Sequence, residues 1–145
     1  MRRATMLGAM VLLLAALGAG GEDPTPAEWR GLYDGPGVFT ERLARTPREW
    51  AQIQALFGVR DAPAIDFTTH MVAAVGIGMR RTGGFSVHIL GAEERDGVLY
   101  VRYRERAPRP DQFVTQALTA PYHVRVLPRL DAPTVRFERV SQPEG

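Results

Sequence analysis

The most regular pattern of apolar and polar positions along the chain predicts a helix over residues 47–57. Thr46 is a favourable N-cap residue, Pro47 suits the first helical position, and Glu49 completes a capping box three residues after the cap. Apolar side chains then recur three and four residues apart, which places them on one face of a helix that packs on a core. This stripe consists of Trp50, Ile53 and Phe57 with Leu56 beside it, and Gly58 ends the helix.

Short apolar segments bounded by Gly and Pro fill most of the remaining chain and predict strands. The segment 71–77 is small and almost continuously apolar, which is typical of a central strand covered on both faces. A single helix among such strands predicts a mainly β or α+β fold, an antiparallel β-sandwich or roll of about 6–7 strands. The predicted strands span residues 38–43, 71–77, 85–92, 98–104, 122–127 and 134–140.

One hairpin, around Asp96 and Gly97, can be given a residue-by-residue register. A two-residue turn there would pair Ile89 with Arg104 and mix apolar with charged side chains on one surface. A three-residue loop over 95–97, with its glycine at positive φ, avoids this mixing. We therefore predict the pairs Ile89–Tyr103, Gly91–Val101 and Glu93–Leu99. The opposite face then collects Ser86, His88, Arg102, Arg104 and Arg106, with His88 opposite Arg104.

The first residues of the chain have the layout of a secretory signal peptide. A short cationic start is followed by an apolar stretch over 6–17 and by small residues at 18–20. The apolar stretch is shorter than the ~20 residues that a membrane-spanning helix needs. We therefore expect an exported protein in the periplasm or medium, with no stable membrane anchor after cleavage. The expected organisation is a signal peptide over 1–20, a linker over 21–28, one domain over 29–140 and a tail over 141–145.

The composition excludes several kinds of chemistry. Cys is absent, which rules out disulfides, thiolate metal sites and a cysteine nucleophile. All 18 cationic residues are Arg, and they stand against 16 acidic residues. Cleavage of the signal peptide would remove Arg2 and Arg3 and leave 16 Arg residues against 16 acidic residues. The basic character of the full chain therefore does not predict nucleic-acid binding. A neutral domain repels other proteins little, which favours association with a partner.

The candidate ligands for a metal ion are the three histidines, His70, His88 and His123. Their spacings match no compact metal motif, and Arg104 opposite His88 would repel a cation, so we expect neither a metal nor another cofactor. Ser86 lies two residues before His88, which is too far along one strand face for a nucleophile and its base. The carboxylates of 93–96 flank a hairpin tip, where adjacent side chains point to opposite faces. No catalytic residue is predicted.

Two irregular connections remain after the regular elements are assigned. The first, over 80–84, ends in Gly83-Gly84, and such a turn can direct backbone N–H groups at an anion with two Arg beside it. The same glycines are also explained by the backbone geometry of a tight turn. The second connection, over 114–123, is too irregular for a strand. It either presents a binding surface or satisfies buried backbone groups.

These connections carry a resemblance to a known family. Residues 66–72 (Asp-Phe-Thr-Thr-His-Met-Val), 82–87 (Thr-Gly-Gly-Phe-Ser-Val) and 114–123 (Val-Thr-Gln-Ala-Leu-Thr-Ala-Pro-Tyr-His) are similar in order and spacing to the PrcB family. The resemblance implies an exported, non-catalytic, β-rich domain. In the protein that named the family, the role is association with a protease and its stabilisation. The protein that named the family resembles a lipoprotein, whereas this chain has no Cys for lipid attachment, and Phe85 stands where Tyr is commoner in the family.

The functional prediction combines the resemblance with the two connections. We expect an exported accessory domain that associates with a secreted or surface protease and stabilises it. Two alternatives stay open: a hydrolase with histidine-bound metal, and a protease inhibitor of the chagasin type, whose Thr-Thr-Gly-Tyr loop is similar to Thr82–Phe85. The predicted partner-binding residues are Arg80, Arg81, Thr82, Gly83, Gly84, Phe85, Gln116, Thr119, Pro121, Tyr122 and His123. A second set, predicted to bind an anion, consists of Ser86, His88, Arg102, Arg104 and Arg106.

Overall fold

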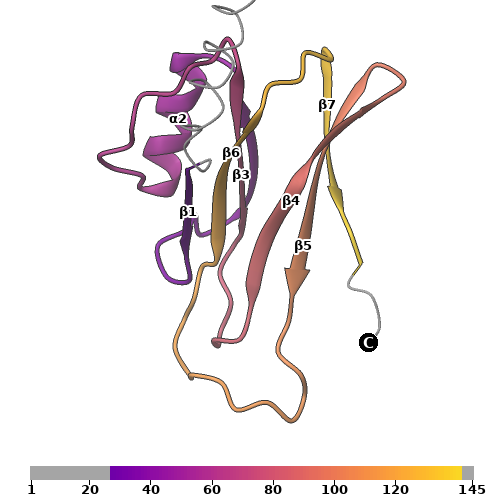
Figure 1. Ribbon diagram of the computed structural model, residues 1–145. Coiled ribbons are helices and arrows are strands. Elements are labelled where there is room, and N and C mark those ends of the chain that lie inside the picture. Colours follow the sequence, from indigo (N-terminus) through magenta and orange to yellow (C-terminus); the bar gives the residue numbers. More distant parts are fainter. Residues whose placement is uncertain (1–26, 142–145) are drawn as a thin grey trace, which may run out of the picture.

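Seven strands and one helix make up the part of the chain that the computed structural model describes, residues 27–141 (Figure 1). The strands form two sheets, and this arrangement confirms the predicted β-sandwich or α+β class. No helix in this part of the chain is long and apolar enough to cross a membrane. The elements are β1 (Glu28–Gly31), β2 (Phe39–Ala44), α2 (Pro47–Phe57), β3 (His70–Ile77), β4 (Ser86–Arg95), β5 (Val98–Arg106), β6 (Tyr122–Pro128) and β7 (Thr134–Arg139).

Helix α2 begins and ends where its sequence predicts. The Thr46 hydroxyl accepts a hydrogen bond from the Glu49 backbone N–H at 3.2 Å, and Gly58 closes the helix in the left-handed region at φ +66°. The apolar stripe packs on one face of the first sheet and forms a core with residues of β3 and β6. Its buried members are Trp50, Ile53 and Phe57, whereas Leu56 is 43% exposed.

The first sheet has the order β1-β6-β3-β2 and is antiparallel throughout. β3 lies inside this sheet, and residues 71–77 are all buried because α2 covers one face and the second sheet covers the other. The predicted central strand is therefore confirmed. The core between the two sheets consists of Met71, Ala73, Val75, Ile77, Val87, Ile89, Leu99, Val101, Tyr103, Leu127 and Ala132.

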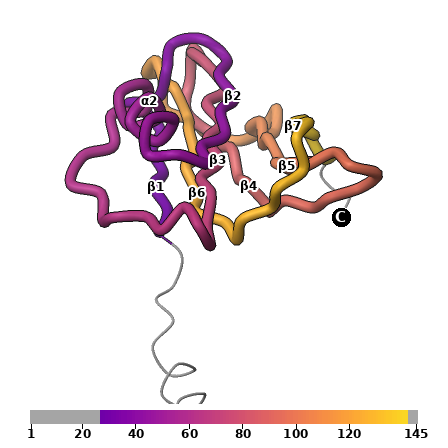
Figure 2. The backbone as a smooth tube through the Cα atoms, turned by 90° about the horizontal axis from the view of Figure 1, so that it is seen from above, coloured from indigo at the N-terminus to yellow at the C-terminus, as the bar shows by residue number. Residues whose placement is uncertain are grey.

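The second sheet has the order β4-β5-β7 and contains a parallel pair, β5 with β7. The expectation of antiparallel pairing fails for this pair. β6 lies between β5 and β7 in the chain but joins the first sheet, so the chain reverses direction twice before β7 reaches β5 (Figure 1). Seen from above, β4 is the strand of the second sheet that lies beside β6 of the first (Figure 2).

The hairpin of β4 and β5 follows the predicted register in its first half only. The predicted pairs His88–Arg104 and Ile89–Tyr103 are confirmed. After Ile89 a β-bulge shifts the register by one residue, and the turn is a two-residue Asp96-Gly97 turn with φ of +51° and +77°. The bulge keeps the apolar side chains on the inner face, so no three-residue loop is needed. The predicted pairs Gly91–Val101 and Glu93–Leu99 are wrong, and the observed pairs are Gly91–Arg102, Ala92–Val101 and Glu94–Leu99.

Strand β1 is an element that the sequence pattern does not predict. It pairs with β6 from Glu28 onward, although the predicted linker extends to residue 28. Its four residues are too few to show an alternating pattern, and its apolar side chain, Trp29, packs beside Trp50 with 5.4 Å between ring centroids. The expected signal peptide over 1–20 lies outside the described residues.

Candidate functional site

Hydrogen bonds tie the two irregular connections of the sequence to each other. Arg80 and Thr119 exchange two backbone hydrogen bonds of 2.8 and 2.9 Å. The Gly83 N–H donates to the Thr115 carbonyl at 2.8 Å, and the Thr119 hydroxyl donates to the Thr82 carbonyl at 2.8 Å. The structure therefore brings together two of the three segments on which the resemblance rests, 82–87 and 114–123.

The connection between β1 and β2 joins the same end of the molecule. The Ala120 N–H donates to the Leu32 carbonyl at 2.8 Å, and the Gly35 N–H donates to the Ala120 carbonyl at 3.0 Å. The Met79 N–H donates to the Gly37 carbonyl at 3.2 Å. We name this region the loop end, and it lies below the strands in Figure 1. The loop end comprises residues 32–39, 78–85 and 107–121.

Exposed apolar side chains concentrate on the loop end. Eight large apolar side chains are exposed among the described residues, and seven of them lie there, Leu56 of α2 being the exception. Phe113 stands fully in solvent, with a relative exposure of 102%. Large apolar side chains grouped on a surface are typical of an interaction site. The seven are Leu32, Tyr33, Val38, Phe39, Met79, Phe113 and Leu118.

The predicted partner-binding residues differ in burial. Arg81, Gly84 and Gln116 are exposed, and Arg80, Thr82, Gly83, Phe85 and Tyr122 are half-buried. Thr119, Pro121 and His123 are buried. The side chains of these three residues are buried in this structure, where they hold the connections and the core together. The sequence analysis missed the exposed apolar residues of the loop end. The feature of the sequence that could have indicated them is a single large apolar residue within a segment rich in turn-forming residues, as at Phe113.

Packing explains the Gly83-Gly84 turn. The Gly83 N–H is already bound by a carbonyl of the neighbouring connection. Gly84 has φ +91°, and a Cβ atom at this position would collide with Pro108 and Val114. These contacts favour the tight-turn interpretation over an anion held by the turn's own N–H groups. Phe85, which follows, packs on the core. Residues 82–85 are therefore held by the neighbouring connection and by the core, and they do not project as a free loop of the kind that the inhibitor alternative uses.

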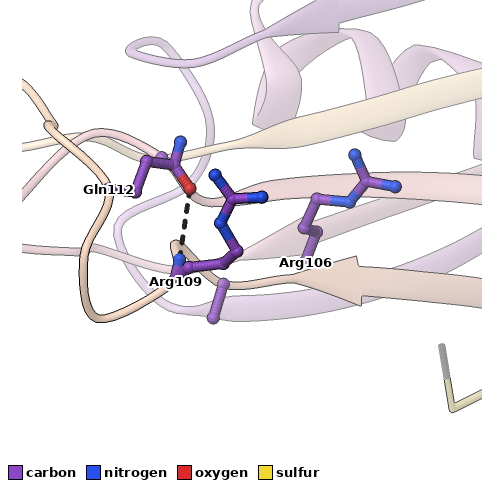
Figure 3. Close-up of a pocket in the computed structure, with 5 residues that line it drawn as sticks. Arg106, Arg109 and Gln112 are labelled. Carbon is purple, nitrogen blue, oxygen red and sulfur yellow. Dashed lines mark hydrogen bonds between the residues drawn. The ribbon is translucent and has the colours of Figure 1, made fainter. Parts of the chain in front are cut away.

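A surface pocket of about 430 Å³ opens where the loop end meets β5. The side chains of Arg106 and Arg109 project to the same side of the chain beside it (Figure 3). The Gln112 Oε1 atom accepts a hydrogen bond from the Arg109 backbone N–H at 3.1 Å, which holds the Gln112 amide at the rim. The pocket is lined by Gly84, Arg106, Ala107, Arg109 and Gln112, none of which is acidic.

A comparison with protein-family models tests the resemblance. Residues 71–128 match PrcB C-terminal. The resemblance seen in the sequence is thereby confirmed for the stretch from β3 to β6, which contains the pocket and two of the three segments of the loop end. No curated protein and no solved structure matches the chain.

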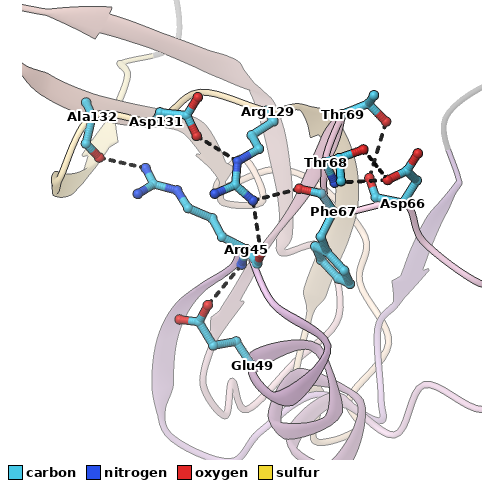
Figure 4. Close-up of polar contacts among 9 residues, drawn as sticks. All are labelled: Arg45, Glu49, Asp66, Phe67, Thr68, Thr69, Arg129, Asp131 and Ala132. Carbon is cyan, nitrogen blue, oxygen red and sulfur yellow. Dashed lines mark hydrogen bonds and ion pairs between the residues drawn. The ribbon is translucent and has the colours of Figure 1, made fainter.

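The PrcB segment begins beside a polar clamp at the opposite end of the sheets from the loop end (Figure 4). The Arg129 guanidinium donates to the carbonyls of Phe67 at 2.7 Å and Arg45 at 3.0 Å, and to the Asp131 carboxylate at 2.7 Å. The Asp66 carboxylate accepts the backbone N–H of the residue two positions on at 2.9 Å. The Asp-Phe-Thr-Thr stretch therefore has a structural role, which is to fix the turn that leads into β3.

Within the PrcB segment, His88 and His123 stack with their ring centroids 5.2 Å apart. His123 is fully buried. Its Nδ1 atom accepts the Ile89 backbone N–H at 2.8 Å, and its Nε2 atom lies 3.3 Å from the Glu28 carboxylate, to which it donates. The Arg30 guanidinium lies 2.6 Å from the His88 Nδ1 atom and donates to it. We name this cluster the polar seam. It consists of Glu28, Arg30, His88, His123 and Arg125.

The polar seam lowers the pKa of both of its histidines and joins the two sheets. Burial, assisted by the charge of Arg30, lowers the pKa of His123 to about 4. Burial also lowers the pKa of His88, with contributions from Arg30 and Arg125. The Arg125 guanidinium donates to the Ile89 carbonyl at 2.7 Å. The Ile89 N–H and carbonyl at the edge of β4 therefore form hydrogen bonds with two side chains of β6. His123 is a structural residue for this reason.

The three histidines do not meet in one place. His70 begins β3 opposite Pro128, whereas His123 lies opposite Val75 of the same strand. These two positions on β3 are five residues apart, or about 16 Å in an extended strand. Among residues 27–141, no three His, Asp or Glu side chains gather as they would around a metal ion.

The residues predicted to bind an anion share one face of β4 and β5, as the register requires. His88 belongs to the polar seam. The Arg102 Nε atom lies 3.6 Å from the Glu138 carboxylate. Ser86 lies opposite Arg106, and of this set Arg106 is the member that lines the pocket. Arg104 lies opposite His88.

Proposed function

We propose that this protein is a non-catalytic accessory domain that binds a partner protein through its loop end. The observation that carries the proposal is the group of seven exposed large apolar side chains at that end. Backbone hydrogen bonds tie three connections to one another and fix the backbone that carries these side chains before a partner arrives. A surface that is already ordered loses little conformational entropy on binding.

The PrcB match supports a protease complex as the setting of this interaction. In our proposal the partner is a protease or another subunit of such a complex, and binding stabilises it. The signal-like pattern of the first twenty residues supports a meeting outside the cytoplasm. The domain contributes a binding surface in this scheme, and the partner carries out the chemistry.

Phe113 is the residue best placed to anchor the partner. It is fully exposed, and Leu118 on the same connection is 61% exposed. Burying one large apolar side chain contributes about 1.5–3 kcal/mol, and aromatic residues often dominate the energy of an interface. Removal of both side chains should therefore weaken binding by roughly 3 kcal/mol, or about a hundredfold in Kd.

Affinity capture from the exported fraction of the native host tests this proposal. The chain carries a C-terminal tag, and mass spectrometry quantifies the retained proteins. The test variant is Phe113→Ser with Leu118→Ser, and the matched control is Leu56→Ser, which removes an exposed apolar side chain from α2. We expect the control to retain the same partner as the unaltered chain and the double variant to lose it. Equal retention by both variants would contradict the proposal.

A further inference from the structure

The pocket at the loop end brings two cations together without an acidic side chain among its lining residues. Among the described residues, Arg106 forms no ion pair. Arg109 pairs with Asp111 at 3.7 Å, and the two side chains are 79% and 85% exposed. An ion pair so exposed to water contributes little. Both guanidinium groups can therefore accept an anion.

We propose that this pocket binds a carboxylate of the partner protein, an inference that rests on the proposed function. A guanidinium presents a planar set of N–H donors that matches the two oxygens of a carboxylate. Gln112 adds a further donor, because its Oε1 atom is held by the Arg109 backbone N–H while its amide nitrogen carries two N–H groups.

The position of Phe113 determines which carboxylate the pocket fits. Phe113 follows Gln112 directly in the chain and is fully exposed. Phe113 does not line the pocket, but it is next to a lining residue in the chain, so we expect a bound peptide longer than one residue to reach its side chain. A peptide with an Asp or Glu residue next to an apolar residue can pair its carboxylate with the two Arg side chains and pack its apolar side chain against Phe113. A free inorganic anion satisfies the cations alone.

The pocket can be tested apart from the partner by titrating the ¹⁵N-labelled full chain at pH 7. The probe is the blocked tripeptide acetyl-Glu-Leu-Glu-amide, and its neutral match is acetyl-Gln-Leu-Gln-amide. We expect saturable shifts of the backbone N–H signals of Gly84, Arg106, Arg109 and Gln112 with the acidic peptide, which weaken as salt is added. Equal shifts with the neutral peptide, or no saturation, would overturn the proposal.

Charge-removing variants locate the effect within the loop end. We expect Arg106→Gln with Arg109→Gln to weaken binding of the acidic peptide at least about tenfold, since the double variant removes the charge-assisted hydrogen bonds of both guanidinium groups. Arg48→Gln removes an exposed cation of α2 that does not line the pocket, and it should bind the peptide as the unaltered chain does. Unchanged binding by the double variant, or equal weakening by Arg48→Gln, would overturn the assignment.

Inorganic phosphate serves as a third probe, and it separates a protein carboxylate from a free anion. Tighter binding of phosphate than of the acidic peptide would overturn the assignment to a protein segment. The two proposals also fail separately. If the peptide does not bind while capture still depends on Phe113 and Leu118, the pocket is wrong and the accessory function stands. If the peptide binds while capture ignores those side chains, the accessory function is wrong.

Discussion

His123 shows how one buried polar residue can hold two sheets together. The hydrogen bond from the Ile89 N–H fixes the proton of the neutral ring on Nε2, where it faces the Glu28 carboxylate. A second proton would have to enter at Nδ1, against the Ile89 N–H. The hydrogen bond at Nδ1 and the lowered pKa of His123 therefore agree, because both disfavour a second proton on the ring.

Replacement of His123 should destabilise the fold strongly. His123→Ala leaves the Ile89 N–H without its acceptor and a cavity in place of a fully buried ring. We expect a loss of about 3 kcal/mol in the free energy of unfolding, measured by urea denaturation. His70→Ala serves as the control, because His70 is half-buried at the start of β3, and it should cost less than about 1 kcal/mol. Similar losses for the two variants would contradict the structural role of His123.

The same residue predicts a pH dependence of stability. The pKa of His123 is about 4 in the folded chain against 6.5 for an ordinary histidine. Between these values the unfolded chain takes up a proton that the folded chain does not, so stability falls as the pH is lowered from 6.5 to 4. The full effect is about 3 kcal/mol. The groups around the ring are Glu28, Arg30, His88 and Arg125.

Urea denaturation at a series of pH values measures this dependence. His123→Ala should be less stable by about 3 kcal/mol near pH 7 and should lose most of the slope between pH 6.5 and 4, so its stability and that of the unaltered chain should converge toward pH 4. The remaining slope belongs to other groups, including His88, whose pKa is also lowered by burial. A variant that kept the full slope would show that the proton is taken up elsewhere.

At the scale of elements, a glycine that packing requires can be distinguished by experiment from one that it does not require, both in the loop end. Gly84→Ala places a Cβ atom against Pro108 and Val114 on a backbone at φ +91°. We expect a loss of about 1–3 kcal/mol in the free energy of unfolding. Gly37→Ala is the control, because its Cβ atom would meet nothing within 4 Å. Thermal unfolding measures both, and equal midpoints would contradict the packing explanation of the Gly83-Gly84 turn.

The elements also show which features the sequence could predict. Helix α2 was predictable because its signals, the Thr46 cap, the apolar stripe and Gly58, all lie within one short segment. The pairing of β4 with β5 was predictable up to Ile89, where the bulge begins. The bulge has one local signal, the glycine at position 91 inside the strand pattern (φ +153°). A register counted from the turn alone does not use this signal, so the second half of the register was wrong. The parallel pair of β5 and β7 depends on β6 joining the other sheet, which no local pattern records.

The candidate site was predictable to a similar extent. Two of the segments that carry the resemblance belong to the irregular connections over 80–84 and 114–123, and the structure places these connections side by side. The resemblance could not separate their buried residues from their exposed ones, because Thr119 and Gln116 stand three positions apart in one irregular segment. It also gave no weight to Phe113 or to the connection between β1 and β2, which lies outside the matched family segment. Whether a residue of an irregular segment is exposed depends on its contacts with residues far away in the sequence. The local sequence pattern does not record these contacts.

At the scale of the whole molecule, the two ends of the sheets have opposite characters. The polar clamp around Arg129 ties three connections with side-chain hydrogen bonds. The loop end ties its connections with backbone hydrogen bonds and leaves its apolar side chains in water. The clamp contributes to stability, and the loop end is assigned to binding, so variants at the two ends should affect different measurements.

Arg129→Ala removes donors from two carbonyls and one carboxylate. We expect it to cost about 2 kcal/mol and to lower the unfolding midpoint by roughly 8 °C. Capture of the partner at a temperature well below that midpoint should not change. Phe113→Ser with Leu118→Ser should have the reverse effect, an unchanged midpoint and lost capture, because both side chains are already in water. Loss of capture by the clamp variant while it remains folded would mean that binding extends beyond the loop end.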